Sequence, residues 1–162
     1  MRFKVRSAAA ALALVAVCFF CFHHPRTLFA AEQGTPVVAT RMYTGADGLT
    51  HIDQIEVKMK ASPEFTPEAG NTGVTELSES VPASKVFVVR SNPGFFETWH
   101  CADVRRYVVT LSGRAEIDAS DGQKDYAEPG NLVLAEDLTG KGHTFRIVSK
   151  DQWVALFVDF AP

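Results

Sequence analysis

Two histidines and one arginine in the C-terminal half of the chain have side chains suited to binding or acid–base chemistry. His100 ends an alternating apolar segment, and His143 follows a glycine-rich loop. Imidazole is a metal ligand and a general acid or base near neutral pH, whereas the guanidinium of Arg106 binds anions. Because side chains alternate between the two faces of a strand, a regular strand places Glu97 opposite to His100. By residue type, His100 and His143 could therefore bind a ligand or transfer protons, and Arg106 could bind an anion.

Other residues that could carry chemistry are interpreted as structural. Cys101 points away from His100 on a regular strand, so we expect a small hydrophobic side chain rather than a nucleophile. Glu136 and Asp137 precede the glycine-rich loop and are expected in a solvated turn. The sequence contains no nucleophile elbow, phosphate-binding loop or paired-cysteine motif.

The first 31 residues have the three parts of a secretory signal peptide. A basic head at residues 2–6 precedes a charge-free apolar run at residues 8–22, and small residues follow at Ala30 and Ala31. The apolar run is shorter than the roughly 20 residues that a membrane-spanning helix needs. We expect an exported protein, periplasmic or secreted, whose mature form has no stable membrane span. An uncleaved membrane anchor is the alternative.

The mature chain that this cleavage predicts is acidic. Without residues 1–31 it has 12 basic and 19 acidic residues, a net charge of −7. Nucleic acids and anionic membrane surfaces both require a basic face, so we expect neither as a partner. Cys101 is the only cysteine of this mature chain, so no internal disulfide can form.

Short apolar segments separated by turns fill the rest of the sequence. Strands are expected within residues 50–59, 74–77, 86–89, 95–100, 107–111, 115–117, 132–135, 143–148 and 153–160. Turn residues such as Asn92-Pro93-Gly94 and Ser120-Asp121-Gly122 separate them. Short strands at this spacing predict a β-sandwich or β-barrel, with less than about a tenth of the mature chain in helix.

The spacing of glycine, proline and histidine resembles the two sequence motifs of the cupin family. Gly94-x5-His100 is similar to the start of the first motif, and Gly113 stands at its end. Pro129-Gly130 and Gly140-x-x-His143 are similar to the second motif. The resemblance covers about residues 86–160 and is strongest in spacing.

The resemblance implies an all-β, cupin-type antiparallel jelly-roll barrel that follows the signal peptide. In this interpretation residues 1–31 are the signal peptide and residues 32–84 are lead-in strands and loops. Residues 85–162 form the cupin barrel, and residues 32–162 fold as one domain. A barrel of this size encloses an interior into which the histidine-bearing faces of the strands would point.

Many cupins hold a divalent metal ion inside the barrel through three histidines and one glutamate. Here Ala102 stands at the position of the second histidine and Arg106 at that of the glutamate. A cation beside a divalent ion is repulsive, and two imidazoles are fewer ligands than a transition metal usually has. We expect no cofactor, or a weakly held divalent metal for which His51 supplies a third nitrogen beside His100 and His143.

Three functions remain open, and the sequence leaves undecided whether the protein is an enzyme. The first is an exported cupin-domain protein that binds a small polar or anionic molecule through three candidate ligand-binding residues, His100, Arg106 and His143. The second is a cupin enzyme, either a metal-dependent oxygenase or an acid–base isomerase or epimerase. The third is a structural or assembly barrel without a ligand. A homodimer is a further partner, with Trp99, Trp153 and Phe160 as candidate contacts.

Each candidate residue also has a structural alternative. His100 could be a core histidine bonded to a backbone carbonyl, and His143 could cap a strand. Arg106 could turn outward and pair with Asp103 or Glu116, as most exposed arginines do. If Arg106 instead points inward it needs a partner, because an unpaired buried charge is costly. The sequence suggests no inward acid near it, and this is the reason for expecting an anionic ligand.

Overall fold

The protein is built from short strands, as the spacing of its turns predicts. The computed structural model describes residues 35–65, 70, 72, 73 and 75–162. The strands are β1 (Val38–Thr44), β2 (Thr50–Glu56), β3 (Met59–Ala61), β4 (Glu76–Ser78), β5 (Ala83–Ser91), β6 (Phe96–His100), β7 (Arg106–Ser112), β8 (Ala115–Ala119), β9 (Lys124–Ala127), β10 (Leu132–Glu136), β11 (His143–Ile147) and β12 (Trp153–Phe160). The helical structure within these residues is one 3₁₀ turn, Pro63–Phe65.

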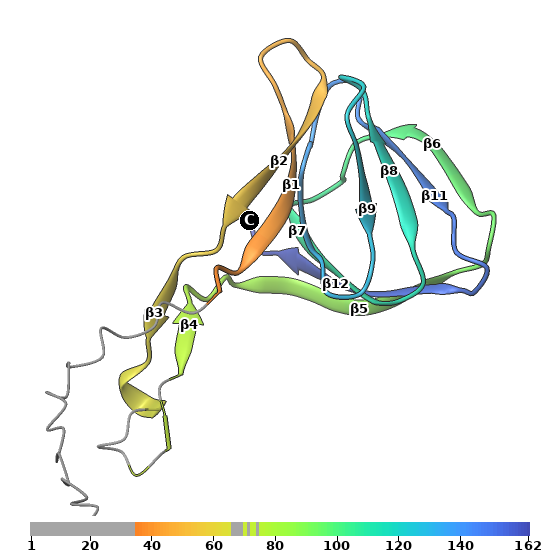
Figure 1. The fold of residues 1–162 in the computed structure, drawn as a ribbon. Helices are drawn as coiled ribbons and strands as arrows, with labels where there is room; N and C mark the ends of the chain where they lie inside the picture. The colour runs from red at the N-terminus through yellow and green to blue at the C-terminus, as the bar shows by residue number, and fades with distance from the viewer. Residues whose placement is uncertain (1–34, 66–69, 71, 74) are drawn as a thin grey trace, which may run out of the picture. The chain divides into compact units, whose positions relative to one another are not determined.

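Two sheets make up the body of the fold (Figure 1). A six-stranded sheet has the order β2-β1-β10-β7-β12-β5, and a four-stranded sheet has the order β6-β11-β8-β9. Strands β3 and β4 pair separately. Among the strands that the structure describes, every pair is antiparallel except β1 with β10, which is parallel. This confirms the all-β jelly-roll class, with one parallel pair that the expected antiparallel arrangement does not contain.

The region from Gly34 to Pro162 forms one compact unit. Strands β1 and β2, from the expected lead-in segment, belong to the same sheet as β7, β10 and β12. The predicted signal peptide, residues 1–31, lies outside the described residues. Within the part of the chain that is described, no helix is long and apolar enough to cross a membrane.

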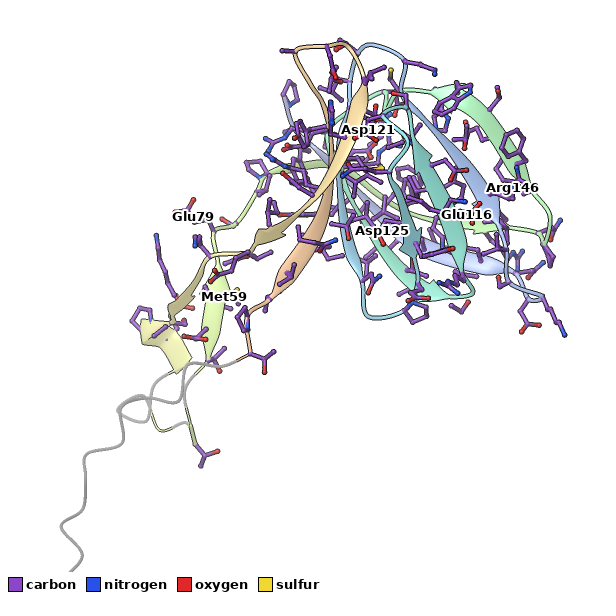
Figure 2. The ribbon with its side chains drawn as sticks, turned by 45° about the horizontal axis from the view of Figure 1, so that its top comes forward. Met59, Glu79, Glu116, Asp121, Asp125 and Arg146 are labelled. Atoms are coloured by element: carbon purple, nitrogen blue, oxygen red, sulfur yellow. The ribbon has the colours of Figure 1, made fainter. Side chains whose placement is uncertain are left out.

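Two strands, β1 and β9, have no counterpart among the expected ones. Strand β9 is polar, and side-chain contacts fix its place beside the six-stranded sheet. Asp125, labelled in Figure 2, accepts a hydrogen bond of 2.8 Å from Thr40 Oγ1 on β1 and one of 3.3 Å from the amide of Gln54 on β2. These polar contacts join the edges of the two sheets where no backbone ladder connects them. Alternation of apolar residues cannot reveal such a strand.

The core lies between the two sheets and combines a few large side chains with many alanines. Its large members include Met42, Ile117 and Trp153. Trp153 is 1% exposed, and its Nε1 donates a hydrogen bond of 3.2 Å to Thr110 Oγ1. Phe160 is also buried, whereas Trp99 is 44% exposed. Of the three aromatic residues proposed for a dimer contact, Trp99 is therefore the one at the surface.

Candidate functional site

A cavity of about 480 Å³ lies between the two sheets and is lined by all three candidate ligand-binding residues. Small inward side chains make this space, because Ala102, Ala127 and Ala135 stand where larger residues would fill it. The apolar part of the wall comes mainly from Met42, Val89, Val108, Phe145, Trp153 and Phe157. A cavity of this size that combines apolar walls with a few polar groups has the composition of a small-molecule site.

A buried carboxylate orients His143. Asp137 is fully buried, and its Oδ2 accepts hydrogen bonds from His143 Nδ1 at 2.6 Å and from Thr50 Oγ1 at 3.0 Å. Because an ionised carboxylate only accepts, the proton of the neutral imidazole lies on Nδ1. Nε2 then carries the free lone pair on a side chain that lines the cavity. The expectation of a solvated turn is wrong for Asp137, which turns inward directly after β10.

His100 lies beside His143 in the same cavity. The two residues are opposite each other in the pairing of β6 with β11, and their ring centroids are 4.3 Å apart. This confirms the expected approach of the two imidazoles. The Nδ1 of His100 lies 2.8 Å from the carbonyl oxygen of Thr98, so Nδ1 is the donor. Both imidazoles therefore present the unprotonated Nε2 in their neutral form.

A β-bulge brings Glu97 to the same face as His100, which the assumption of a regular strand does not allow. His143 pairs with His100 and Phe145 pairs with Glu97, so two steps on β11 match three steps on β6. Glu97 consequently lines the cavity, and its Oε2 lies 3.6 Å from His100 Nε2. The prediction that Glu97 lies on the opposite face is wrong.

Arg106 lines the cavity, but its charge already has partners. Its Nε lies 2.9 Å from Asp159 Oδ1, and its terminal nitrogen forms an ion pair with Asp103. The guanidinium also lies over the ring of Phe157, 5.2 Å from the centroid. The expectation that no inward acid lies near Arg106 is wrong, because β12 pairs with β7 and places Asp159 directly opposite. The alternative pairing with Asp103 is also present.

His51 is occupied elsewhere, in a surface cluster between two turns. Its Nε2 lies 3.0 Å from Asp47 Oδ1 in the β1–β2 turn, and its Nδ1 lies 2.8 Å from Asp121 Oδ2 in the β8–β9 turn. Figure 2 labels Asp121. The ring also stacks on Tyr43. His51 is not among the residues that line the cavity, so the structure does not bring together His51, His100 and His143.

The His51 cluster predicts a dependence of stability on pH. The hydrogen bond to Asp47 is the main cause that raises the pKa of His51, and the same bond lowers the pKa of Asp47. A raised pKa in the folded state means that the His51 contribution is complete below about pH 6.5 and is lost as pH rises through the folded-state pKa. Urea unfolding of wild type and His51→Gln between about pH 5 and pH 9 should therefore show a wild-type advantage that shrinks with rising pH. A difference that stays constant across this range would contradict the prediction.

The remaining groups near the cavity do not assemble a metal site or a nucleophile. Across residues 35–65 and 75–162 and the three described residues between them, no group of three or more His, Cys, Asp or Glu side chains could hold a metal ion. Cys101 lines the same cavity as His100, so the expectation that it points away from that histidine is wrong. Burial chiefly, with a smaller effect of the Asp137 charge, raises the pKa of its thiol. A protonated thiol is a poor nucleophile.

Comparison with known proteins gives structural neighbours of low sequence identity. No family model and no curated protein sequence matches the chain. A cupin domain from Bordetella pertussis is 19% identical over 48% of this chain and 80% of its own, with a TM-score of 0.39. The Cupin_2 domain of an XRE family transcriptional regulator from Enterobacter cloacae is 26% identical over the same shares, with a TM-score of 0.37. The capsular polysaccharide assembling protein CapF from Staphylococcus aureus is 16% identical over 65% of this chain and 29% of its own, with a TM-score of 0.38.

Proposed function

We propose that this cupin-type jelly roll binds a small polar organic molecule in the cavity between its sheets. The observation that carries the proposal is His143, whose Nδ1 is bonded to the buried Asp137 while its Nε2 has no hydrogen-bond partner among the described residues. An imidazole held in one orientation at the wall of a largely apolar cavity offers a ligand an acceptor at a defined place. A barrel with a purely structural role does not need such a group.

Acid–base catalysis is the second candidate, and the same pair of residues supports it. A carboxylate that holds Nδ1–H of an imidazole favours proton uptake at Nε2, because it stabilises the imidazolium that forms. His100 presents a second Nε2 beside the first, so one ring could remove a proton while the other returns it. Isomerisation or epimerisation of a bound molecule requires these two steps. We also propose export of the protein, on the basis of the predicted signal peptide.

A cavity-filling substitution tests whether the cavity is the binding site. Ala135 is buried on β10 and lines the cavity, so Ala135→Leu adds apolar volume without removing a polar group. We expect small organic compounds at about ten times their dissociation constant to raise the melting temperature of wild type on the order of 5 °C and that of Ala135→Leu by much less. The matched control is Ala61→Leu at an exposed position on β3, which should keep the full shift.

The competing structural role makes the opposite prediction. If no compound of a broad library of amines, alcohols, carboxylates and sugars stabilises the wild type, the cavity is not a binding site. Shifts of the same size in wild type and Ala135→Leu would place the binding outside the cavity. Either result would favour a barrel without a ligand.

A further inference from the structure

We propose that the ligand of this cavity is an organic cation, a protonated amine with an apolar or aromatic body, rather than a carboxylate or phosphate. The inference rests on the proposed function, because it names the chemical class that the same cavity binds. It replaces the anionic ligand expected from Arg106, and it follows from the hydrogen-bonding character, the charge and the walls of the site.

Apart from Arg106, whose guanidinium is paired with Asp103 and Asp159, the charged and imidazole side chains that line the cavity offer acceptors. Thr98 O and Asp137 Oδ2 engage the Nδ1 atoms of the two histidines, so His100 and His143 each present an Nε2 lone pair. Glu97 adds a carboxylate whose Oε2 lies 3.6 Å from the Nε2 of His100. An ammonium group supplies up to three donors and no acceptor, so it can satisfy several of these atoms at once. At His100, His143 and Glu97 a carboxylate would meet acceptors with acceptors.

The charges around the cavity also favour a cation. Glu97 and Asp103 line the cavity together with Arg106, whereas Asp137 and Asp159 lie buried beside the lining residues His143 and Arg106. Four carboxylates against one guanidinium leave a net charge of −3 when both imidazoles are neutral. Asp137 Oδ1 is buried without a hydrogen-bond partner, so its charge is not fully compensated. An anionic ligand would have to share Arg106 with Asp103 and Asp159 in this negative field.

Aromatic side chains supply the surface for the body of the ligand. Phe145 and Trp153 pack edge to face, with ring centroids 4.9 Å apart, and Phe157 lies next to Trp153 at 6.2 Å. All three line the cavity. Aromatic rings attract a cation over their faces and bury apolar groups over a large area. The walls therefore suit an amine that has a hydrocarbon or aromatic body.

The test compares ligands that share a body and differ in charge. Phenethylamine, 2-phenylethanol and 3-phenylpropionate form one series, and hexylamine, hexanol and heptanoate form another. Titration calorimetry on the intact protein at pH 7.5 should give a dissociation constant for each amine at least about tenfold below that of the matched carboxylate. We define the ratio as the dissociation constant of the carboxylate divided by that of the matched amine. In Glu97→Gln we expect this ratio to fall by about threefold or more, because the variant removes one negative charge from the cavity wall.

Controls separate the cavity from the general acidity of the protein. Glu79→Gln, which removes a carboxylate at an exposed position that does not line the cavity (Figure 2), should leave the ratio unchanged. Carboxylates that bind as tightly as the amines, or tighter, would overturn the inference and leave the proposed function standing. A ratio that falls as much in Glu79→Gln as in Glu97→Gln would overturn it in the same way. If no member of either series binds, the inference fails and the library screen alone decides the proposed function. If Ala135→Leu binds them all unchanged, the proposed function fails together with this inference.

Discussion

Replacing Gly142 by alanine is expected to lower the free energy of unfolding by more than about 4 kcal/mol. Gly142 has a φ of +77°, a left-handed conformation that costs an L-residue roughly 1–2 kcal/mol. A Cβ atom at this position would also lie 1.9 Å from the carbonyl oxygen of His100 and 2.3 Å from its carbonyl carbon. Both are backbone atoms, so the glycine-rich loop or the end of β6 would have to move. This close approach is what places His143 beside His100.

Gly130→Ala is the matched control for this substitution. Gly130 also has a positive φ, of 95°, but a Cβ atom there would meet no atom within 4 Å. Urea unfolding should therefore show a loss of about 1–2 kcal/mol for Gly130→Ala, from the backbone conformation alone. Equal losses for the two variants would mean that the loop does not pack against His100 as described.

The second large effect is expected from Asp137→Ala, with a loss of about 3 kcal/mol in the free energy of unfolding. The carboxylate is fully buried and accepts hydrogen bonds from both His143 Nδ1 and Thr50 Oγ1. Its removal leaves two donors without partners in the interior. Loss of the burial cost of the charge offsets part of this effect, so the expected value lies at the lower end for a broken buried pair.

Asp103→Ala is the control for Asp137→Ala, measured by the same urea unfolding. Asp103 also forms an ion pair, with Arg106, but its side chain is 79% exposed. Arg106 keeps Asp159 as a partner in this variant, so the loss should be no more than about 1 kcal/mol. A loss for Asp137→Ala no larger than that for Asp103→Ala would show that the His143–Asp137 pair does not form inside the protein.

Much of the fold was predictable because apolar and polar residues alternate along the strands, as a half-buried sheet requires, and because turn residues separate the strands. Strands such as β7 and β12 have apolar runs bounded by glycine or polar turns, and their positions agree with the expected ranges. Strand β9 was not predictable, because its sequence Lys124-Asp125-Tyr126-Ala127 is mostly polar. It pairs with β8, and contacts from Thr40 and Gln54, about 70 to 85 residues away in sequence, attach it to the six-stranded sheet.

The candidate site was predictable in its histidines but not in its acids. His100 and His143 follow from strand position and from the cupin resemblance. Glu97 lines the cavity because of a β-bulge between β6 and β11, and no local sequence pattern on β6 predicts this bulge. Asp159 reaches Arg106 only because β12 pairs with β7, and Asp137 is buried by partners from β2 and β11. With these acids, the net charge of the side chains around the cavity is negative, whereas the sequence led us to expect a positive charge from Arg106.

A high-resolution crystal structure of the protein with an amine that stabilises it would show directly whether the cavity binds a ligand. We predict ordered density for the amine inside the cavity, with its nitrogen within hydrogen-bonding distance of the Nε2 atoms of His100 and His143. We also predict that Asp137 remains bonded to the Nδ1 of His143. A cavity filled by the protein's own side chains, or a ligand bound only at the outer surface, would contradict the proposed binding site.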